Sequence, residues 1–126
     1  MLKYVREVVS LGFGFERLFF ITFVFLMVTH IVACLWVFFA GFSGDYKNTW
    51  MEGEFSEMSA KEQYLVSFYW TVTTITTVGY GDISITSNTE RICCILLMVF
   101  GVVGFGLLSG SLTNILHNYD DSNAKF

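Results

Sequence analysis

Residues 76–82 read Thr-Thr-Val-Gly-Tyr-Gly-Asp, a run in which two glycines alternate with Val78 and Tyr80. Glycine tolerates backbone dihedral angles that other residues avoid, so Gly79 and Gly81 can turn successive carbonyl groups to one side of the chain. Carbonyl oxygens arranged in this way can replace the water around a dehydrated monovalent cation. The alternative is an ordinary turn capped by Asp82, and the segments on either side distinguish the two.

Two long charge-free runs flank this motif. No Asp, Glu, Lys or Arg occurs between Arg17 and Asp45, and residues 18–42 contain only three polar side chains. A run of this length can cross roughly 30 Å of hydrocarbon as a tilted helix. A second charge-free run lies between Arg91 and Asp120. A buried helix of a soluble protein is the alternative for each run, but two of them in 126 residues, with 54% hydrophobic composition and no proline, indicate a membrane protein.

A third charge-free window, residues 63–81, is too rich in hydroxyl groups for a helix that faces lipid. The glycine-broken backbone at its end could not be satisfied by lipid, so the window must be buried in protein or line water. We therefore expect a short re-entrant helix over residues 60–76, followed by an extended segment over 77–82 that returns to the surface. The partly negative C-terminus of this helix would point toward the membrane centre and favour a cation there.

The distribution of basic residues predicts the orientation. Residues 1–17 carry three basic residues against two acidic ones, whereas residues 43–62 carry five acidic residues against two lysines. The positive-inside rule then places both termini in the cytoplasm and the acidic connection, which includes Asp45, outside. This connection either raises the cation concentration at a pore mouth or is simply a solvated loop. The net charge of −4 argues against a nucleic-acid partner.

Chain length predicts the assembly. One copy of residues 77–82 cannot encircle an ion, so a closed cyclic oligomer is required, and we expect a homotetramer. We predict one domain over residues 15–118, with an outer helix 15–42, a turret 43–59, a pore helix 60–76, a filter 77–82 and an inner helix 89–118. Residues 1–14 would form a cytoplasmic or interfacial arm, with a turn at Gly12 and Gly14, and residues 119–126 would begin a cytoplasmic linker.

Residues 74–82, Thr-Ile-Thr-Thr-Val-Gly-Tyr-Gly-Asp, resemble the pore signature of potassium channels, and residues 77–81 repeat the TVGYG filter loop of that family. Residues 67–73 resemble its pore helix, and Phe-Gly-Leu at 105–107 stands as in its inner helix. His-Ile-Val-Ala-Cys-Leu-Trp at 30–36 resembles the branch related to cyclic-nucleotide-gated, ether-à-go-go and plant inward-rectifying channels. The Thr113-Asn114 pair also resembles the plant members. The resemblance covers essentially the whole chain.

The resemblance implies an all-α membrane protein, in which two transmembrane helices, a re-entrant pore helix and a filter loop assemble as a fourfold tetramer. It implies a potassium-selective channel pore that conducts K⁺ passively, with K⁺ as the only metal ion and no organic cofactor. A nonselective cation pore and a non-conducting membrane assembly subunit are the alternatives. Cyclic-nucleotide-gated channels, which pass several cations, lack the Gly-Tyr-Gly triplet that this chain has at residues 79–81.

The resemblance also assigns roles to residues of the filter. Successive K⁺ sites would be formed by the backbone carbonyl groups of four residues: Thr77, Val78, Gly79 and Tyr80. The Thr77 hydroxyl would complete the innermost site. The side chains of Val78 and Tyr80 would point away from the pore and brace the strand against the pore helix. Filter support would come from Thr76, Gly81, Asp82, Trp70 and Thr73. Asp82 would hydrogen-bond back toward the pore helix, with Trp70 as a candidate donor, although a tryptophan there can also be a buried or interfacial anchor. Two departures from the family pattern would weaken this network: Thr73 stands where some bacterial channels have Glu, and Tyr69 where many relatives have Trp.

Four glycines interrupt the apolar run of the inner helix, at positions 101, 104, 106 and 110. Small residues allow close helix packing in membranes, and each glycine also weakens the helix by about 1 kcal/mol. By resemblance, the hinge would include Gly101 and Gly106. Residues that fall on one helical face would line the cavity and reach the inner gate: Val102, Phe105, Ser109, Thr113 and His117. The absence of proline excludes the branch with Pro-x-Pro kinks.

The remaining reactive residues predict no second chemistry. Cys34, Cys93 and Cys94 lie in or beside the spans, so we expect buried thiols. His30 and His117 have no ligand at metal-site spacing, and His30, as an ionisable residue inside a span, should have a hydrogen-bond partner. No nucleophile–base or paired-carboxylate arrangement is present, so we predict that the chain is not an enzyme.

The two ends resemble linkers of longer channel subunits. The arm 1–14 resembles the connection from a voltage-sensor domain, and residues 117–126 resemble the start of a linker to a cyclic-nucleotide-binding domain. We therefore expect either a pore that is part of a longer subunit or a natural minimal channel.

Overall fold

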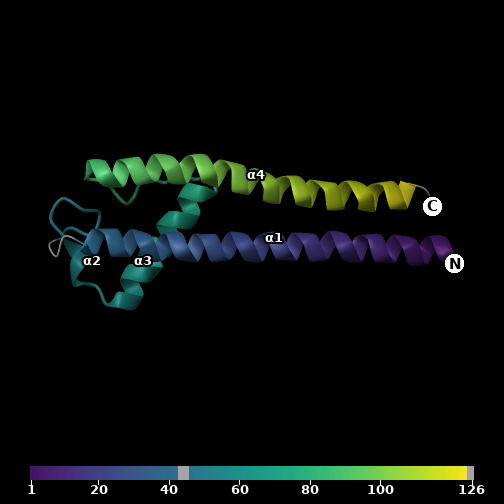
Figure 1. Ribbon diagram of the computed structural model, residues 1–126, viewed down its shortest axis with the longest axis horizontal. Helices are drawn as coiled ribbons and strands as arrows, with labels where there is room; N and C mark the ends of the chain where they lie inside the picture. Colours follow the sequence, from purple (N-terminus) through teal and green to yellow (C-terminus); the bar gives the residue numbers. More distant parts are fainter. Residues whose placement is uncertain (43–45, 125–126) are drawn as a thin grey trace. The chain divides into compact units, whose positions relative to one another are not determined.

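The computed structural model describes residues 1–42 and 46–124. Asp45, counted above in the acidic connection, lies outside the described residues, as do the last two residues of the predicted linker. The structure contains four helices, α1 (Leu2–Gly41), α2 (Glu54–Glu57), α3 (Ala60–Ile75) and α4 (Asn88–Ala124) (Figure 1). No strand occurs among the described residues. The chain is therefore all-helical over this part, as predicted.

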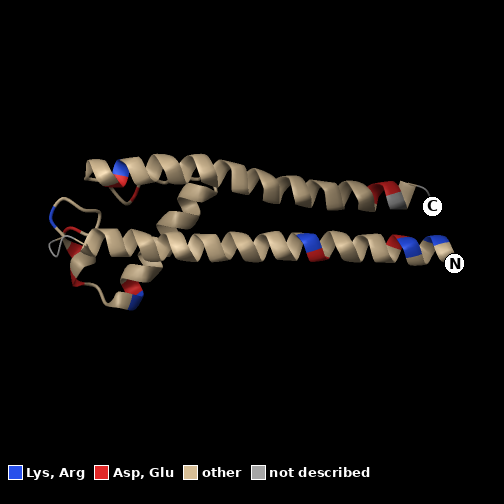
Figure 2. Cartoon of the chain, in the orientation of Figure 1, with Lys and Arg blue, Asp and Glu red and all other residues tan. Residues whose placement is uncertain are grey.

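Two of these helices, α1 and α4, are long and apolar enough to cross a membrane. Their most apolar windows have mean hydropathies of 2.5 and 2.6, and only 11% of each window is buried. Figure 2 shows a long uncharged stretch in each helix, which runs in α1 from its middle to its C-terminal end and lies in α4 between charged residues near its two ends. A core helix of a soluble protein would be mostly buried, so the low burial favours two spans whose apolar surface faces lipid or other chains.

The ends of both helices extend beyond the predicted ranges. α1 begins at Leu2 and runs through Gly12 and Gly14, so the turn expected at these glycines is absent. A glycine costs a helix only about 1 kcal/mol, which the surrounding helix-compatible residues offset. α4 continues to Ala124, beyond the predicted end at residue 118. The roles of residues 1–14 and 119–126 as linkers stay predictions.

The chain divides into two compact units, residues 1–26 with 104–126 (unit 1) and residues 27–103 (unit 2). In unit 1, the N-terminal half of α1 packs against the C-terminal part of α4. Ile115 is buried there, and a Cβ added at Gly14 would lie 3.2 Å from its side chain. Gly14 therefore serves close packing of the two helices.

Unit 2 contains the core. Its central feature is a stack of three indole rings, in which Trp36 lies 4.2 Å from Trp70 and 6.3 Å from Trp50 between ring centroids. These tryptophans come from α1, α3 and the connection between them, so the stack joins three segments. Four further buried residues complete the cluster: Ala40, Met51, Ile83 and Cys94.

Candidate functional site

α3 leads into the 76–82 motif and begins with a capping box. The Ser59 hydroxyl accepts from the Glu62 backbone N–H, and the Glu62 carboxylate accepts from the Ser59 backbone N–H at 2.8 Å. These bonds satisfy N–H groups that a helix start leaves unpaired. The hydrogen bonds from Ser59 lower the pKa of the Glu62 carboxyl below its usual value.

Three contacts, three residues apart on each helix, fasten α3 to α1. His30 Nδ1 lies 2.6 Å from the Tyr64 hydroxyl, and the Ser67 hydroxyl donates to the Ala33 carbonyl at 2.7 Å. The Trp36–Trp70 stack is the third contact. His30 thus has the hydrogen-bond partner that its position in a span predicted. Because these contacts are polar and directional as well as apolar, they fix the rotation of α3 about its axis.

The hydroxyl groups that mark α3 as unusual bond to the helix itself. Thr71, Thr73, Thr74 and Thr76 each donate to a backbone carbonyl three or four residues earlier, at 2.7–2.9 Å. Three of these four are buried, and Thr76 is partly buried. The side of α3 that carries these threonines is therefore buried in protein. The sequence predicted that this segment is either buried in protein or lines water.

The chain leaves α3 through a turn that anchors the motif. The backbone N–H groups of Val78 and Gly79 both donate to the Thr73 carbonyl, at 2.9 and 3.0 Å. Thr73 was predicted to support the motif, and this carbonyl gives it a defined contact. The anchor holds the first half of residues 77–82 against the end of α3.

Beyond the anchor, the backbone alternates in handedness. The φ angle is 64° at Thr77, 57° at Gly79 and 71° at Gly81, and no other described residue between 76 and 82 has a positive φ. Residues of opposite handedness in alternation turn successive carbonyl groups toward the same side. The glycines were expected to permit this geometry; Thr77 was not, because a β-branched residue rarely adopts positive φ.

The motif lies on the surface of the single chain. Every residue from Thr77 to Asp82 is exposed, with Val78 at 53% and Tyr80 at 71%, although buried residues precede and follow the run. The side chains of Val78 and Tyr80 were expected to brace the strand against the pore helix. Such exposure leaves both side chains available to another copy of the chain.

Asp82 has a partner on α3, one residue away from the predicted donor. The Tyr69 hydroxyl donates to the Asp82 carboxylate, and this bond raises the pKa of the Tyr69 phenol. Trp70, the predicted donor, is buried in the indole stack. Tyr69, which stands in the sequence as a departure from the family pattern, contacts Asp82 directly.

The glycines of α4 differ in their surroundings. A Cβ at Gly101 would lie 3.1 Å from the Ile75 Cα, so this glycine allows α4 to approach the end of α3. Gly104 and Gly106 have no atom within 4 Å of an added Cβ. α4 is helical through all three. Close packing thus accounts for Gly101, whereas the two later glycines have no such contact among the described residues.

The residues predicted to line a cavity and gate are exposed in the single chain. Val102 belongs to unit 2, and the other four belong to unit 1: Phe105, Ser109, Thr113 and His117. The Thr113 hydroxyl donates to the Ser109 carbonyl at 2.9 Å. His117 Nδ1 lies 3.2 Å from an Asp121 carboxylate oxygen.

Sequence reasoning missed Glu90, a buried carboxylate at the start of α4 that is 6% exposed. Trp50 donates to it through its backbone N–H at 3.0 Å, although the two residues are 40 positions apart. The signal was present in the sequence, because Ser87-x-x-Glu90 has capping-box spacing. The spacing alone could not reveal the bond to Trp50.

The three thiols are free and differ in exposure. Cys94 is buried and Cys93 is partly buried, but Cys34 is exposed, which corrects the expectation of a wholly buried set. Among the described residues, no group of three or more His, Cys, Asp or Glu side chains could hold a metal ion.

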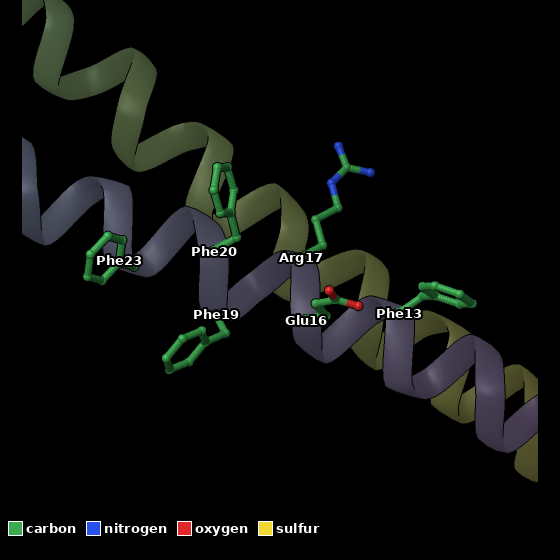
Figure 3. A pocket seen from close by; sticks show the side chains of 6 residues that line it. All are labelled: Phe13, Glu16, Arg17, Phe19, Phe20 and Phe23. Carbon is green, nitrogen blue, oxygen red and sulfur yellow. The ribbon is translucent and has the colours of Figure 1, made fainter.

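A hollow lies along α1 in unit 1, lined by Phe13, Glu16, Arg17, Phe19, Phe20 and Phe23 (Figure 3). Its aromatic rings stand beside Glu16 and Arg17, the charged pair directly before the long apolar run. Aromatic and basic side chains gather in this way where a span meets the membrane surface.

Comparison with known proteins adds independent evidence. Residues 18–118 match the ion channel family. Potassium channel AKT1 of Arabidopsis thaliana is 34% identical over 94 residues, which cover 72% of this chain and 11% of that protein. Potassium channel KAT2 of the same organism is 28% identical over 104 residues, covering 80% of this chain and 15% of that protein. Potassium voltage-gated channel unc-103 of Caenorhabditis elegans is 24% identical over 119 residues, covering 81% of this chain and 14% of that protein.

The chain therefore spans only 11–15% of the length of these three relatives. The family match covers most of the chain and includes the larger part of each long apolar helix, which supports a membrane location. The chain belongs to the ion channel family, which confirms the resemblance to potassium channels, their plant members included, and the prediction that it is not an enzyme.

Proposed function

We propose that four copies of this chain form a potassium-selective pore that conducts K⁺ passively across a membrane. The observation that carries this proposal is the alternation of φ at Thr77, Gly79 and Gly81. A backbone of this kind turns consecutive carbonyl groups to one side, and a ring of such carbonyls can replace the hydration shell of K⁺.

The ion sites would be formed by the carbonyls of Thr77, Val78, Gly79 and Tyr80, with the Thr77 hydroxyl completing the innermost site. The Thr73 carbonyl supports this assignment, since it anchors the two N–H groups at the centre of the run. The Tyr69–Asp82 bond ties the outer end of the same run to α3. The filter would therefore be held to α3 at its centre and at its outer end.

Tetramer formation is supported by what the single chain leaves uncovered. Residues 77–82 are exposed, and the two long helices bury little of their apolar surface. Because one copy cannot surround an ion, a cyclic assembly gives the exposed run its function. In that assembly α3 would be the re-entrant pore helix, entering from the outer side and ending near the membrane centre.

The proposed orientation places both termini in the cytoplasm and the connection from α1 to α3 outside. The excess of basic residues before the first span supports it. The hollow beside Arg17 supports a membrane surface at that level. The acidic side chains of the connection would then face the outer solution and attract cations.

Gating would involve the glycine segment of α4. The boundary between the two units falls between Val103 and Gly104. Gly106 has free space around an added Cβ, whereas Gly101 is packed against Ile75. We infer that bending, when it occurs, takes place C-terminal to Gly101, and that residues 102–117 contain the cavity lining and the inner gate.

The longer relatives suggest how the chain is used. The matched region is a small part of each of them. We propose that the chain serves as the pore of a longer subunit, with a voltage-sensor domain before it and a cyclic-nucleotide-binding domain after it.

Flux measurements test the proposal. The purified chain is reconstituted in liposomes, and K⁺ and Na⁺ fluxes are compared under the same gradient. Selective K⁺ flux is expected. Equal fluxes would indicate a nonselective cation pore, and the absence of flux under all gradients would indicate a non-conducting membrane assembly subunit.

A further inference from the structure

Glu90 is a buried carboxylate that the proposed conduction pathway does not use. The carboxylate accepts from three backbone N–H groups: that of Trp50, at 3.0 Å from one oxygen, and those of Thr86 and Ser87, at 3.2 and 3.3 Å from the other. A buried carboxylate is costly unless it is hydrogen-bonded. These donors therefore fix the place where the outer connection, the segment after the filter and α4 meet.

The three bonds serve two purposes. Those from Thr86 and Ser87 are local, and with the Glu90 N–H bonded to the Ser87 hydroxyl at 3.1 Å they form the usual cap of a helix start. The bond from Trp50 is not needed for capping. It joins the connection before α3 to the helix after the filter, so it closes a loop of chain that contains α3 and the whole filter.

One series of contacts leads from Trp50 to α3. The Trp50 indole N–H donates to the Trp36 carbonyl at 3.2 Å, and the two rings stack. Trp36 stacks in turn on Trp70. Glu90 is thus connected to α3 by an unbroken set of contacts in the core of unit 2.

This series of contacts continues from Trp70 to the backbone of the filter, residues 77–82. The Thr73 hydroxyl donates to the Trp70 carbonyl at 2.9 Å. The Thr73 carbonyl then accepts from Val78 and Gly79. The inner half of the filter is therefore connected, contact by contact, to the place where Glu90 binds Trp50.

A second series of contacts, from Trp50 and Glu90, reaches the segment that follows the outer end of the filter. Ile83 follows Asp82 directly, is 6% exposed and belongs to the same buried cluster as Trp50. Residues 86 and 87 are held by the Glu90 carboxylate. The segment that leaves the filter is thus tied down at its start by burial and at its end by Glu90.

We propose that Glu90 is a positioning residue for the filter: by bonding Trp50 and residues 86–87 with one buried carboxylate, it holds both ends of residues 77–82 in the conformation that binds K⁺. That K⁺ is the bound ion rests on the proposed function. The effect of Glu90 on the backbone conformation of residues 77–82 does not. Spatial continuity alone does not demonstrate energetic coupling, so the test measures the filter itself.

The test compares Glu90→Gln with Glu52→Gln in the reconstituted protein. Glu52 is a matched control, because it lies in the same connection and accepts one backbone N–H, from Asn48 at 2.7 Å, but is exposed. Hydrogen exchange of the amides of residues 77–82 is the main readout and requires no conduction. We expect faster exchange in Glu90→Gln and unchanged exchange in Glu52→Gln.

The second readout is the permeability ratio of K⁺ to Na⁺. It should fall by about fivefold or more in Glu90→Gln, the lower end of the range for coupling between distant sites, and stay unchanged in Glu52→Gln. If the unmodified protein passes no current, the proposed function fails while the exchange comparison still tests Glu90.

Wild-type exchange at residues 77–82 in Glu90→Gln would overturn the proposal, even if the variant unfolds at a lower temperature, because Glu90 would then only cap α4. Should this variant not assemble, Glu90→Asp takes its place. It keeps the charge but draws the carboxylate one methylene away from the Trp50 amide. Faster exchange at residues 77–82 is again expected, and unchanged exchange overturns the proposal.

Discussion

Thr77 carries backbone strain at the scale of a single residue. A left-handed conformation costs a non-glycine residue about 1–3 kcal/mol and persists only where the surroundings enforce it. Here the Thr77 N–H donates to the Thr74 carbonyl at 3.2 Å, and the next two N–H groups share the Thr73 carbonyl. A strained residue whose own N–H and the next two N–H groups are all bonded suits a role in which its hydroxyl and carbonyl must keep fixed positions.

Gly79→Ala tests the backbone requirement at the centre of the run. A Cβ there meets no atom within 4 Å of the same chain, so the cost arises from the φ of 57°. We expect a penalty of about 1–2 kcal/mol for the left-handed conformation, loss of selective K⁺ flux, and an intact tetramer. Flux and the mass of the assembly are measured together.

Gly12→Ala is the matched control, because Gly12 is helical and also has open space around an added Cβ. Its flux should equal that of the unmodified protein. Selective flux in Gly79→Ala at the wild-type level would contradict the role given to the alternating backbone.

At the scale of the element, α4 depends on a glycine for its contact with α3. Gly101→Ala would place a methyl group 3.1 Å from the Ile75 backbone, which cannot rotate away as a side chain can. Overpacking of this kind costs about 1–3 kcal/mol, so thermal unfolding should occur at a lower temperature. Gly104→Ala, on the same helix and in open space, should be neutral or stabilising. Equal effects of the two substitutions would argue against close packing as the role of Gly101.

The start of α3 should respond to acid. Hydrogen bonds from Ser59 lower the pKa of Glu62 in the folded protein below 4.5. A depressed pKa contributes stability that is fully present above the unfolded value and is lost as the pH falls through the folded value. Glu62→Gln should therefore make stability less dependent on pH below about 4.5 than in the unmodified protein. Unfolding curves at several acidic pH values measure this, with Glu57→Gln in α2 as the control; identical acid dependence in Glu62→Gln and wild type would refute it.

The sequence was sufficient for the two spans and for α3, because charge-free length and hydroxyl content are local signals. It was insufficient where contacts join distant residues. The Trp50–Glu90 bond and the Tyr69–Asp82 bond depend on how segments pack, which no spacing encodes. The start of α1 at Leu2 was not predicted, because Gly12 and Gly14 were interpreted as a turn. Each glycine raises the free energy of the helix only slightly, and Gly14 packs against Ile115.

At the scale of the whole molecule, the single chain exposes the residues that carry its proposed function. Tyr80 is 71% exposed, although Ile75 at the end of α3 is buried. A tetramer around residues 77–82 would bury this ring between copies, and burying an aromatic side chain contributes roughly 1.5–3 kcal/mol. Tyr80→Ala should therefore lower the temperature at which the tetramer dissociates in detergent.

Tyr4 provides the comparison, because it is 69% exposed but lies near the start of α1. Tyr4→Ala should leave the dissociation temperature close to that of the unmodified protein. If the two substitutions weaken the tetramer equally, Tyr80 is not at the interface that the proposal requires.

The central claim is that carbonyl groups of residues 77–80 bind K⁺ in preference to Na⁺. Solid-state NMR of the ¹³C-labelled carbonyls of Val78 and Gly79, in reconstituted protein titrated with K⁺ and then with Na⁺, tests it independently of the state of any gate. We predict chemical-shift changes that saturate with K⁺ and that Na⁺ at the same concentration does not reproduce. Carbonyl shifts that do not depend on K⁺, or that respond equally to both ions, would contradict the account.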